Sequence, residues 1–359
     1  MIAAVRAGTL AAAARRARER AVRFGGMGAP PPMVTVVMPV RNEARFIRRS
    51  LDAVMAQDYP RDLLEIVVVD GASEDDTASI VRSMSDRHPG LRLLDNPRRI
   101  QAAALNLGIR AARGEIVVRV DGHSFVAPDY VSRCVELLSA GRAENVGGRM
   151  RPEAEGWAPR GIALATSSRF GLGNSKFHYS EGECFVDTVY LGAYRRETLE
   201  RIGLYDESVD VNEDYELNYR LRRAGGRILL SPRIRSTYHP RTSFGGLAHQ
   251  YLRYGRWKAR VLRKHPGSLV WRQAVAPLLV AALVSTALAA PVWRAAGLAF
   301  AAIAGVYLLA CGLAALAAAR SEWRLVGAVA LAFVTLHLSW GTGMWWGLVA
   351  PPPPSIEGR

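Results

Sequence analysis

The sequence contains few cysteines, and it lacks the short motifs that mark several common enzyme classes. Only three of its 359 residues are cysteine, Cys134, Cys184 and Cys311. Isolated thiols make neither a disulfide framework nor a zinc site, and their scarcity fits a reducing cytosol. There is no GxxxxGKS/T phosphate loop, no serine or cysteine beside a paired base, and no internal repeat. These absences argue against a disulfide-stabilised secreted domain, a P-loop enzyme and a covalent hydrolase.

The N-terminus lacks the unbroken apolar stretch of a signal peptide, because arginines recur among its alanines from Arg6 onward. Residues 1–32 are expected to form a basic helix and a linker, with the helix either resting on a membrane surface or fraying in solvent. The tail, residues 351–359, ends in Ile356–Arg359. That ending resembles a protease-cleavage scar and is excluded from the fold prediction.

Acidic residues are outnumbered, 32 against 47 lysines and arginines, which gives a formal net charge of +15. Basic residues gather just before the first long apolar run: Arg253, Arg256, Lys258, Arg260, Arg263, Lys264 and Arg272. Attraction to anionic lipid explains this distribution. Nucleic-acid binding is the alternative, but no aromatic-basic platform or recognition helix is evident. We therefore expect membrane lipids, and no nucleic acid, as partners.

Three long uncharged runs end the chain, bounded by Arg272, Arg294, Arg320 and Arg324. Each is about 20 residues or longer, enough to cross a hydrocarbon layer of ~30 Å. Residues 273–350 are thus predicted to hold three transmembrane helices, with a soluble helical domain as the alternative. The positive-inside rule then places residues 1–272 and the Arg320–Arg324 turn in the cytoplasm, and the Arg294 turn and the C-terminus outside.

Apolar strands alternate with helical patterns in the first third of the chain. The predicted strands are Val34–Met38, Glu65–Asp70, Leu91–Leu94 and Glu115–Asp121, with helices over 43–56, 76–86 and 102–112. This order predicts an α/β domain with a mainly parallel sheet covered on both faces. Residues 150–190 read as a long irregular region, and helical periodicity returns over 198–221.

Three acidic clusters stand along this pattern: Asp70, Asp121-Gly122-His123 and Glu213-Asp214. The first two follow strands, and ligands of open α/β sheets collect at the carboxyl ends of strands. Asp70 could accept hydrogen bonds from a nucleotide base or ribose, or could cap the next helix. Asp121 and His123 could hold a divalent metal against a diphosphate, with an Asx-turn and a solvent-exposed histidine as the alternative.

Glu213-Asp214 could supply a general base that takes a proton from an attacking hydroxyl. The alternative is that both acids only decorate a helix N-terminus, where the helix dipole favours negative charge.

The order of these elements resembles the inverting glycosyltransferases of family 2, which have the GT-A fold. The motifs are Pro39-Val-Arg-Asn42-Glu43, Val69–Thr77, Ala104-Leu-Asn106-Leu-Gly108, Asp121-Gly-His123 in place of the family's DxD, Glu213-Asp214, and Gln250-x-x-Arg253-Tyr254 in place of QxxRW. The residues in and around these motifs are most similar to those of bacterial succinoglycan-type exopolysaccharide glycosyltransferases. The resemblance spans about Val34 to Lys258. It implies a Rossmann-like GT-A domain with a mostly parallel sheet, followed by transmembrane helices.

The resemblance also implies a role for each matching residue. The donor would be a nucleotide sugar, and we expect a UDP-sugar. It would be bound by Pro39, Asn42, Glu43, Asp70, Asn106 and Asp121. Asp121 and His123 would hold Mn²⁺ or Mg²⁺, with His239 as a further candidate whose alternative role is structural; imidazole favours manganese. Asp214 would be the catalytic base. The acceptor or diphosphate would be contacted by Asp187, Glu213, Gln250 and Arg253.

The sequence thus predicts a glycosyltransferase in the bacterial inner membrane, with a cytoplasmic catalytic domain over 33–258 and a basic juxtamembrane segment over 259–272. The expected acceptor is a hydroxyl of a lipid-linked saccharide in exopolysaccharide or cell-envelope glycan synthesis. Two alternative functions are a polyprenyl-phosphate glycosyl synthase, which would need little base catalysis, and a non-catalytic membrane scaffold. A processive synthase fits less well, because those proteins usually have more than three spans and the complete tryptophan motif.

Overall fold

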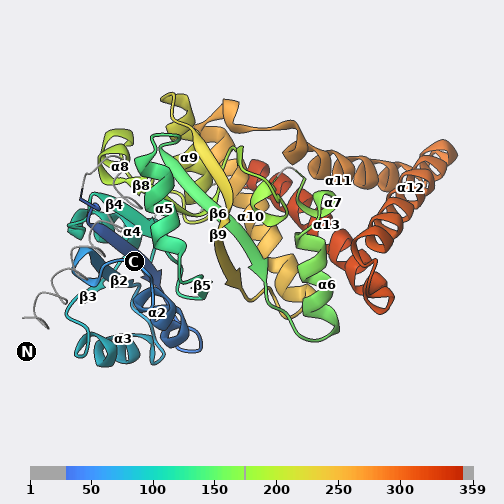
Figure 1. Ribbon diagram of the computed structural model, residues 1–359. Coiled ribbons are helices and arrows are strands. Elements are labelled where there is room, and N and C mark those ends of the chain that lie inside the picture. Colours follow the sequence, from blue (N-terminus) through green and yellow to red (C-terminus); the bar gives the residue numbers. More distant parts are fainter. Residues whose placement is uncertain (1–29, 174, 351–359) are drawn as a thin grey trace, which may run out of the picture. The chain divides into compact units, whose positions relative to one another are not determined.

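The computed structural model describes residues 30–173 and 175–350 (Figure 1). The predicted N-terminal basic helix and the tail fall on positions 1–29 and 351–359, outside the described residues. The chain divides into two compact units. Among the described residues, 30–150, 181–205 and 217–236 form the sheet unit, and 151–180, 206–216 and 237–350 form the helical unit.

The sheet unit is built on a sheet of nine strands within residues 30–350, in the order β3-β2-β1-β4-β8-β6-β9-β5, with β7 paired to β9. The strands are β1 Val34–Val40, β2 Leu64–Asp70, β3 Leu91–Asp95, β4 Ile116–Arg119, β5 Ser124–Val126, β6 Asn145–Pro152, β7 Cys184–Phe185, β8 Tyr190–Arg195 and β9 Ile228–Tyr238. The four strands predicted from apolar runs are confirmed as β1 to β4.

The sheet is mixed. β1 pairs in parallel with both β2 and β4, and β2 with β3, so that Val40 lies beside Asp70 and Asp70 beside Asp95. The β4–β8, β6–β8 and β7–β9 pairs are antiparallel. In the parallel part of the sheet, β1 to β4, a helix follows each of the first three strands and returns the chain to the end of the sheet where the next strand begins. The carboxyl ends of β1, β2 and β4 therefore meet at one edge.

Helices of the sheet unit bury apolar stripes on the sheet. They are α2 Ile47–Met55, α3 Thr77–Ser85, α4 Gln101–Ala111, α5 Tyr130–Ser139 and α8 Arg196–Ile202, with a 3₁₀ turn at Arg61–Leu63. Ile47, Leu51 and Val54 of α2 are fully buried in the core that Val36 and Val68 also form. Their i, i+4, i+7 spacing is the apolar face of an amphipathic helix. α9, Glu213–Arg223, begins among residues of the helical unit and ends among those of the sheet unit.

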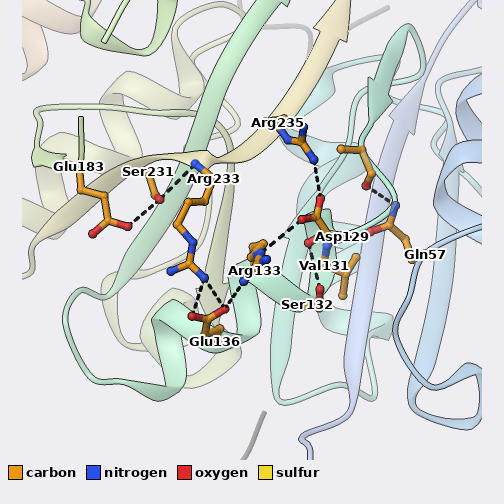
Figure 2. A network of polar contacts seen from close by, with 11 residues as sticks. Gln57, Asp129, Val131, Ser132, Arg133, Glu136, Glu183, Ser231, Arg233 and Arg235 are labelled. Atoms are coloured by element: carbon orange, nitrogen blue, oxygen red, sulfur yellow. Dashed lines mark hydrogen bonds and ion pairs between the residues drawn. The ribbon is translucent and has the colours of Figure 1, made fainter. Parts of the chain in front are cut away.

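Ion pairs attach α5 to β9 (Figure 2). Arg233 contacts Glu136 at 2.7 and 2.9 Å, and Arg235 contacts Asp129 at 3.3 Å. Arg133 lies between the two carboxylates and contacts both. Residues 233 and 235 share one face of the strand because side chains alternate along it. This spacing matches the two acids that stand at the start and in the second half of α5.

The irregular region expected over 150–190 contains more helix than predicted. Its helices are α6 Trp157–Thr166, α7 Arg169–Leu172 and a 3₁₀ turn at Lys176–His178. Ile162 and Ala165 of α6 are buried in one apolar cluster with residues of the C-terminal helices. Packing against distant residues, which local composition does not reveal, stabilises α6.

The helical unit contains four long helices among the residues described: α10 Phe244–Lys264, α11 Trp271–Ala289, α12 Arg294–Ala318 and α13 Val326–Val349, with 3₁₀ turns at Pro266–Ser268 and Trp323–Leu325. The expected domain boundary at residue 258 falls inside α10. Three segments are long and apolar enough to cross a membrane: Trp271–Ala289, Arg294–Ala318 and Trp323–Val349. Only 6% and 11% of the first two are buried, against 39% of the third.

Candidate active site

The loops that follow β1 and β2 are joined by side chains of both. Asp70 is 5% exposed, and its carboxylate accepts hydrogen bonds from the Ser73 amide at 3.1 Å and the Ser73 hydroxyl at 2.5 Å. That hydroxyl in turn accepts from the Asn42 amide, and the Asn42 carboxamide oxygen accepts from the Glu74 amide, at 2.8 Å. Asn42 and Ala72 have a left-handed backbone, with φ of 55° each. Asp70 thus organises the loop that follows its own strand.

A second carboxylate fixes the same pair of loops. Asp75 accepts hydrogen bonds from the Ala44 amide at 3.1 Å and from the amide and hydroxyl of Thr77. Loss of water contacts acts to raise the pKa of Asp75, although the residue is exposed, but these hydrogen bonds outweigh it and leave the pKa below its ordinary value. The Thr77 hydroxyl also accepts from the Glu43 amide at 2.7 Å. Glu43 is therefore held at its backbone, next to the end of β1.

Asp121 follows β4 and forms a buried ion pair with Arg119. The guanidinium donates to both carboxylate oxygens, Nε at 2.8 Å and Nη2 at 3.3 Å. Arg119 and Asp121 are 8% and 7% exposed. Two parallel N–H···O contacts fix the plane of a carboxylate as well as its position. Arg119 was not predicted from the sequence as a site residue. It could have been noticed, because it is a charged residue within the apolar run Ile116–Val120.

His123 lies two residues beyond Asp121, and its Nδ1 is 2.7 Å from Oε1 of Glu43. The His123 side chain is 43% exposed and that of Glu43 is 19% exposed. The histidine is thus partly open to solvent but oriented by a carboxylate. Within residues 30–173 and 175–350, no group of three or more histidine, cysteine or acidic side chains is placed to hold a metal. Asp121 and His123 remain the predicted protein donors.

Other predicted donor-site residues have structural contacts. Asn106 is 2% exposed; its carboxamide donates to the Tyr205 carbonyl and accepts from the Tyr205 amide, both at 2.9 Å. Pro39 lies within β1, beside Val69 of β2. Nucleotide binding by either residue stays a prediction. Asp187, predicted on the acceptor side, is half-buried and follows β7, and the adjacent Thr188 hydroxyl accepts from Asn218 of α9 at 2.9 Å.

Glu213 and Asp214 occupy the first turn of α9, where the helix dipole favours negative charge. Asn212, just before them, has a left-handed φ of 67°. Glu213 is 5% exposed, and the Asp214 carboxylate accepts from the Tyr215 amide at 2.7 Å. Placement at a helix N-terminus is therefore observed, and it is compatible with a catalytic role.

The QxxRY segment of α10 lies next to this acidic turn, within the helical unit. The Asn212 side chain donates to the Tyr254 carbonyl at 3.1 Å, and Gln250 donates to the Tyr254 hydroxyl at 2.9 Å. Burial raises the pKa of the Tyr254 phenol; a hydrogen bond from Gln250 opposes this, and the charges of Asp214 and Glu213 raise it further. Tyr254 is therefore a neutral hydrogen-bonding group beside the acidic pair.

Further contacts place the remaining predicted residues. Arg253 forms an ion pair with Asp210 at 3.1 Å, and Arg241 donates to the Gln250 carboxamide oxygen at 3.1 Å. His239 has its Nδ1 3.1 Å from the Glu153 carbonyl. Its metal role stays a prediction. Asp210 and Arg241 were not anticipated, because their relation to α10 depends on tertiary packing.

A mixed sheet with carboxylates after β2 and β4 is the GT-A arrangement of nucleotide-sugar transferases. The chain belongs to glycosyl transferase family 2, and the sequence model of that family matches residues 35–203. It is 33% identical over 316 residues to the succinoglycan biosynthesis protein ExoA of Rhizobium meliloti (strain 1021), covering 86% of this chain and 93% of that protein. The protein is thus a glycosyltransferase, and the predicted family is confirmed.

Two further proteins support this assignment. A dolichyl N-acetyl-alpha-D-glucosaminyl phosphate 3-beta-D-2,3-diacetamido-2,3-dideoxy-beta-D-glucuronosyltransferase of Methanococcus voltae is 27% identical over 246 residues, covering 66% of this chain and 76% of that one. The mannosyltransferase PcManGT from Pyrobaculum calidifontis, solved in complex with GDP-Man and Mn²⁺, is 26% identical with a TM-score of 0.56. The similarity covers 85% of this chain and 87% of that structure.

Proposed function

We propose that the protein transfers a sugar, with inversion, from a nucleotide-diphosphate sugar to a hydroxyl of a lipid-linked saccharide. The observation that carries the proposal is the acidic turn Glu213-Asp214 beside Tyr254 and Gln250. It lies in the unit that also holds the apolar helices, so acceptor chemistry and membrane attachment belong to one part of the chain. The Methanococcus relative, named for an acceptor sugar on dolichyl phosphate, supports a lipid-linked acceptor.

Asp70 and Asp121 would bind the donor, for which a UDP-sugar is our first choice. Asp70 ends β2, and Asp121 follows β4 with its plane set by Arg119. Asn42 and Glu43 would complete this side of the site. Arg253 and Gln250 would contact the diphosphate or the acceptor, and Asp187 would line the acceptor side.

The donor set of one carboxylate and one imidazole fits a divalent ion that takes its other ligands from phosphate and water. Asp121 and His123 would hold Mn²⁺ or Mg²⁺. The Mn²⁺ complex of the Pyrobaculum mannosyltransferase supports this assignment. When bound, the ion would neutralise negative charge on the departing nucleoside diphosphate.

Asp214 would act as general base. It would take the proton from the acceptor hydroxyl while the oxygen attacks the anomeric carbon on the face opposite the leaving nucleotide. Glu213, which is more buried, would be a positioning residue that keeps the turn negatively charged. We place the reaction at the cytoplasmic face of a bacterial inner membrane, in exopolysaccharide or cell-envelope glycan synthesis.

The test combines a donor panel with a base variant. Purified protein is offered UDP-, GDP- and dTDP-sugars with and without Mn²⁺, and nucleoside diphosphate release is measured. Asp214→Asn should bind the preferred donor with wild-type affinity in calorimetry but lose transfer by roughly 10²–10⁴-fold, the usual contribution of a general base. Asp52→Asn, which removes an exposed carboxylate on α2, is the control. Wild-type turnover by Asp214→Asn would exclude the base assignment.

A further inference from the structure

The helix α13 is apolar enough to span a membrane, like α11 and α12, but it has different neighbours. It runs side by side with α10 over most of its length (Figure 1). A Cβ on Gly255 would lie 2.3 Å from the Trp340 carbonyl oxygen, and one on Gly343 would lie 2.1 Å from that of Leu252. A Cβ on Gly347 would likewise lie 2.5 Å from the carbonyl oxygen of Arg256. The two backbones are therefore in direct contact at successive turns.

The partner helix α10 is strongly basic and is tied to polar residues of the 206–216 segment. Arg253 pairs with Asp210, Lys264 contacts Asp206, and His265 directly after the helix lies 2.9 Å from Glu216. Lys258 is 1% exposed and donates to the Ser268 carbonyl at 2.9 Å. A helix with this many charges and polar partners belongs outside the hydrocarbon layer.

The C-terminal end of α13 is held by α10 and lies beside the 206–216 segment. Arg263 donates to the Leu348 carbonyl at 2.5 Å and lies 3.5 Å from that of Ala350. A pocket of about 650 Å³ is lined there by Val349 and Ala350 together with Ser208, Val209 and three cations of α10. The end of α13 thus lies beside the segment that precedes the acidic turn Glu213-Asp214.

The N-terminal end of α13 is held by α6. The Trp157 indole donates to the Arg324 carbonyl at 3.1 Å, and a Cβ on Gly161 would lie 2.4 Å from Cβ of Ala328. Between its ends, α13 meets the first half of α11: the indoles of Trp340 and Trp345 donate to the carbonyls of Gln273 and Pro277. α13 therefore extends between two polar attachment points.

We infer that the chain crosses the membrane twice, through α11 and α12, and that α13 lies along the cytoplasmic surface with its outer face on lipid. A third crossing would either draw the arginines of α10 into the bilayer or separate Val349 from Ser208. Leu331, Trp345 and Trp346 are 45%, 41% and 48% exposed. Trp345 also contacts α11 and Trp346 lies against Arg256 of α10, and the exposed parts of all three would meet lipid. Apolar and indole side chains of this kind suit the membrane interface.

A chain with two crossings and a chain with three crossings differ in the side of the membrane on which residue 350 lies. Both place Arg294 outside and the Arg320–Arg324 turn inside, so the charge rule does not separate them. Two crossings put residue 350 in the cytoplasm, whereas three crossings put it outside.

The test uses single cysteines in a background where the three native cysteines are replaced by alanine. Val292→Cys reports on the α11–α12 turn, Ser321→Cys on the α12–α13 turn and Val349→Cys on the end of α13. A membrane-impermeant maleimide is applied to spheroplasts and to inverted vesicles, and nucleoside diphosphate release confirms a folded protein. We expect Val292→Cys to react in spheroplasts, and Ser321→Cys and Val349→Cys to react only in inverted vesicles.

Two outcomes would overturn the inference. Val349→Cys reacting in spheroplasts, like Val292→Cys, would establish three crossings. Val292→Cys reacting only in inverted vesicles would mean that the hairpin does not cross. Where the cysteine-free background fails to fold, a green fluorescent protein or alkaline phosphatase fused after residue 359 of the native chain gives the same answer. Fluorescence supports a cytoplasmic end, and phosphatase activity contradicts it.

Discussion

At the scale of single residues, Asp121 and His123 are held by different partners. Arg119 occupies both oxygens of the Asp121 carboxylate from within the same strand region, whereas Glu43 holds Nδ1 of His123. A carboxylate that accepts from Nδ1–H fixes the tautomer in which Nε2 carries the lone pair for a metal. Glu43 would then be a positioning residue for the proposed metal site.

We expect Glu43→Gln to weaken Mn²⁺ binding about 10–100-fold, because outer partners of metal-bound histidines have effects of that size. His123→Asp should shift the preference from Mn²⁺ toward Mg²⁺, since imidazole is the softer donor. Calorimetric titration of each ion in the presence of nucleoside diphosphate measures both effects. His88→Asp, in the loop that follows α3, is the control. Unchanged ion affinities in Glu43→Gln and His123→Asp would exclude His123 as a ligand.

The sequence was sufficient to predict strands β1 to β4, because valine-rich runs of strand length that alternate with helices have few other structures. It also indicated that Asp70 and Asp121 follow strands. It could not indicate that Arg119 pairs with Asp121 or that Tyr254 lies beside Glu213-Asp214. The first depends on side-chain direction at a strand end, and the second joins residues about 40 positions apart. The helix α6 was missed for the same reason, since its main partner, α13, is more than 150 residues away.

At the scale of secondary-structure elements, the α10–α13 contact depends on glycines. Gly343→Ala should destabilise the protein by about 1–3 kcal/mol, because the added methyl group would overlap the Leu252 carbonyl. Gly312→Ala on α12, where a Cβ meets nothing within 4 Å, is the matched control. It should be neutral or slightly stabilising, since glycine in a helix is about 0.5–1 kcal/mol less favourable than alanine. Thermal unfolding in one detergent would compare them, and equal losses would contradict the packing argument.

The ion pairs between α5 and β9 predict acid sensitivity. Partial burial acts to raise the pKa values of Asp129 and Glu136, but hydrogen bonds from Arg133, Arg233 and Arg235 outweigh it and leave both below their ordinary values. A depressed folded-state pKa contributes stability that is complete above the unfolded value of about 4 and is lost as the pH falls through the folded value. The loss should therefore begin near pH 4 and continue below it.

Arg233→Met should lower the unfolding midpoint at pH 7 more than at pH 3.5, because part of the stabilisation that Arg233 gives to ionised Glu136 is already lost below the unfolded pKa. Arg87→Met, an exposed substitution on the turn after α3 with the same change in net charge, is the control. Midpoints are compared at the two pH values in one buffer system. A midpoint shift of Arg233→Met that is the same at both pH values would show that the pair contributes nothing electrostatic.

At the scale of the whole molecule, α11 and α12 carry exposed apolar side chains along their length. Leu278 of α11 and Leu298 and Leu309 of α12 are 65%, 73% and 63% exposed. Patches of this extent on soluble proteins are uncommon and mark interaction with other apolar material. We expect alkaline carbonate to leave the protein in the membrane pellet and a mild detergent to extract it. Release by carbonate would contradict insertion of the α11–α12 hairpin.

The contact of α13 with α10 also decides how a water-soluble version of this enzyme has to be made. Cutting the chain after Lys264 would remove α13 and uncover Leu247 and Tyr251, which are 1% and 9% exposed in the complete protein. Such a fragment should aggregate, although α10 reads as a polar helix. Deleting only the α11–α12 hairpin and linking residue 270 to residue 321 would retain the cover. The last apolar helix, α13, therefore keeps the enzyme soluble by covering these side chains, in addition to any role in membrane attachment.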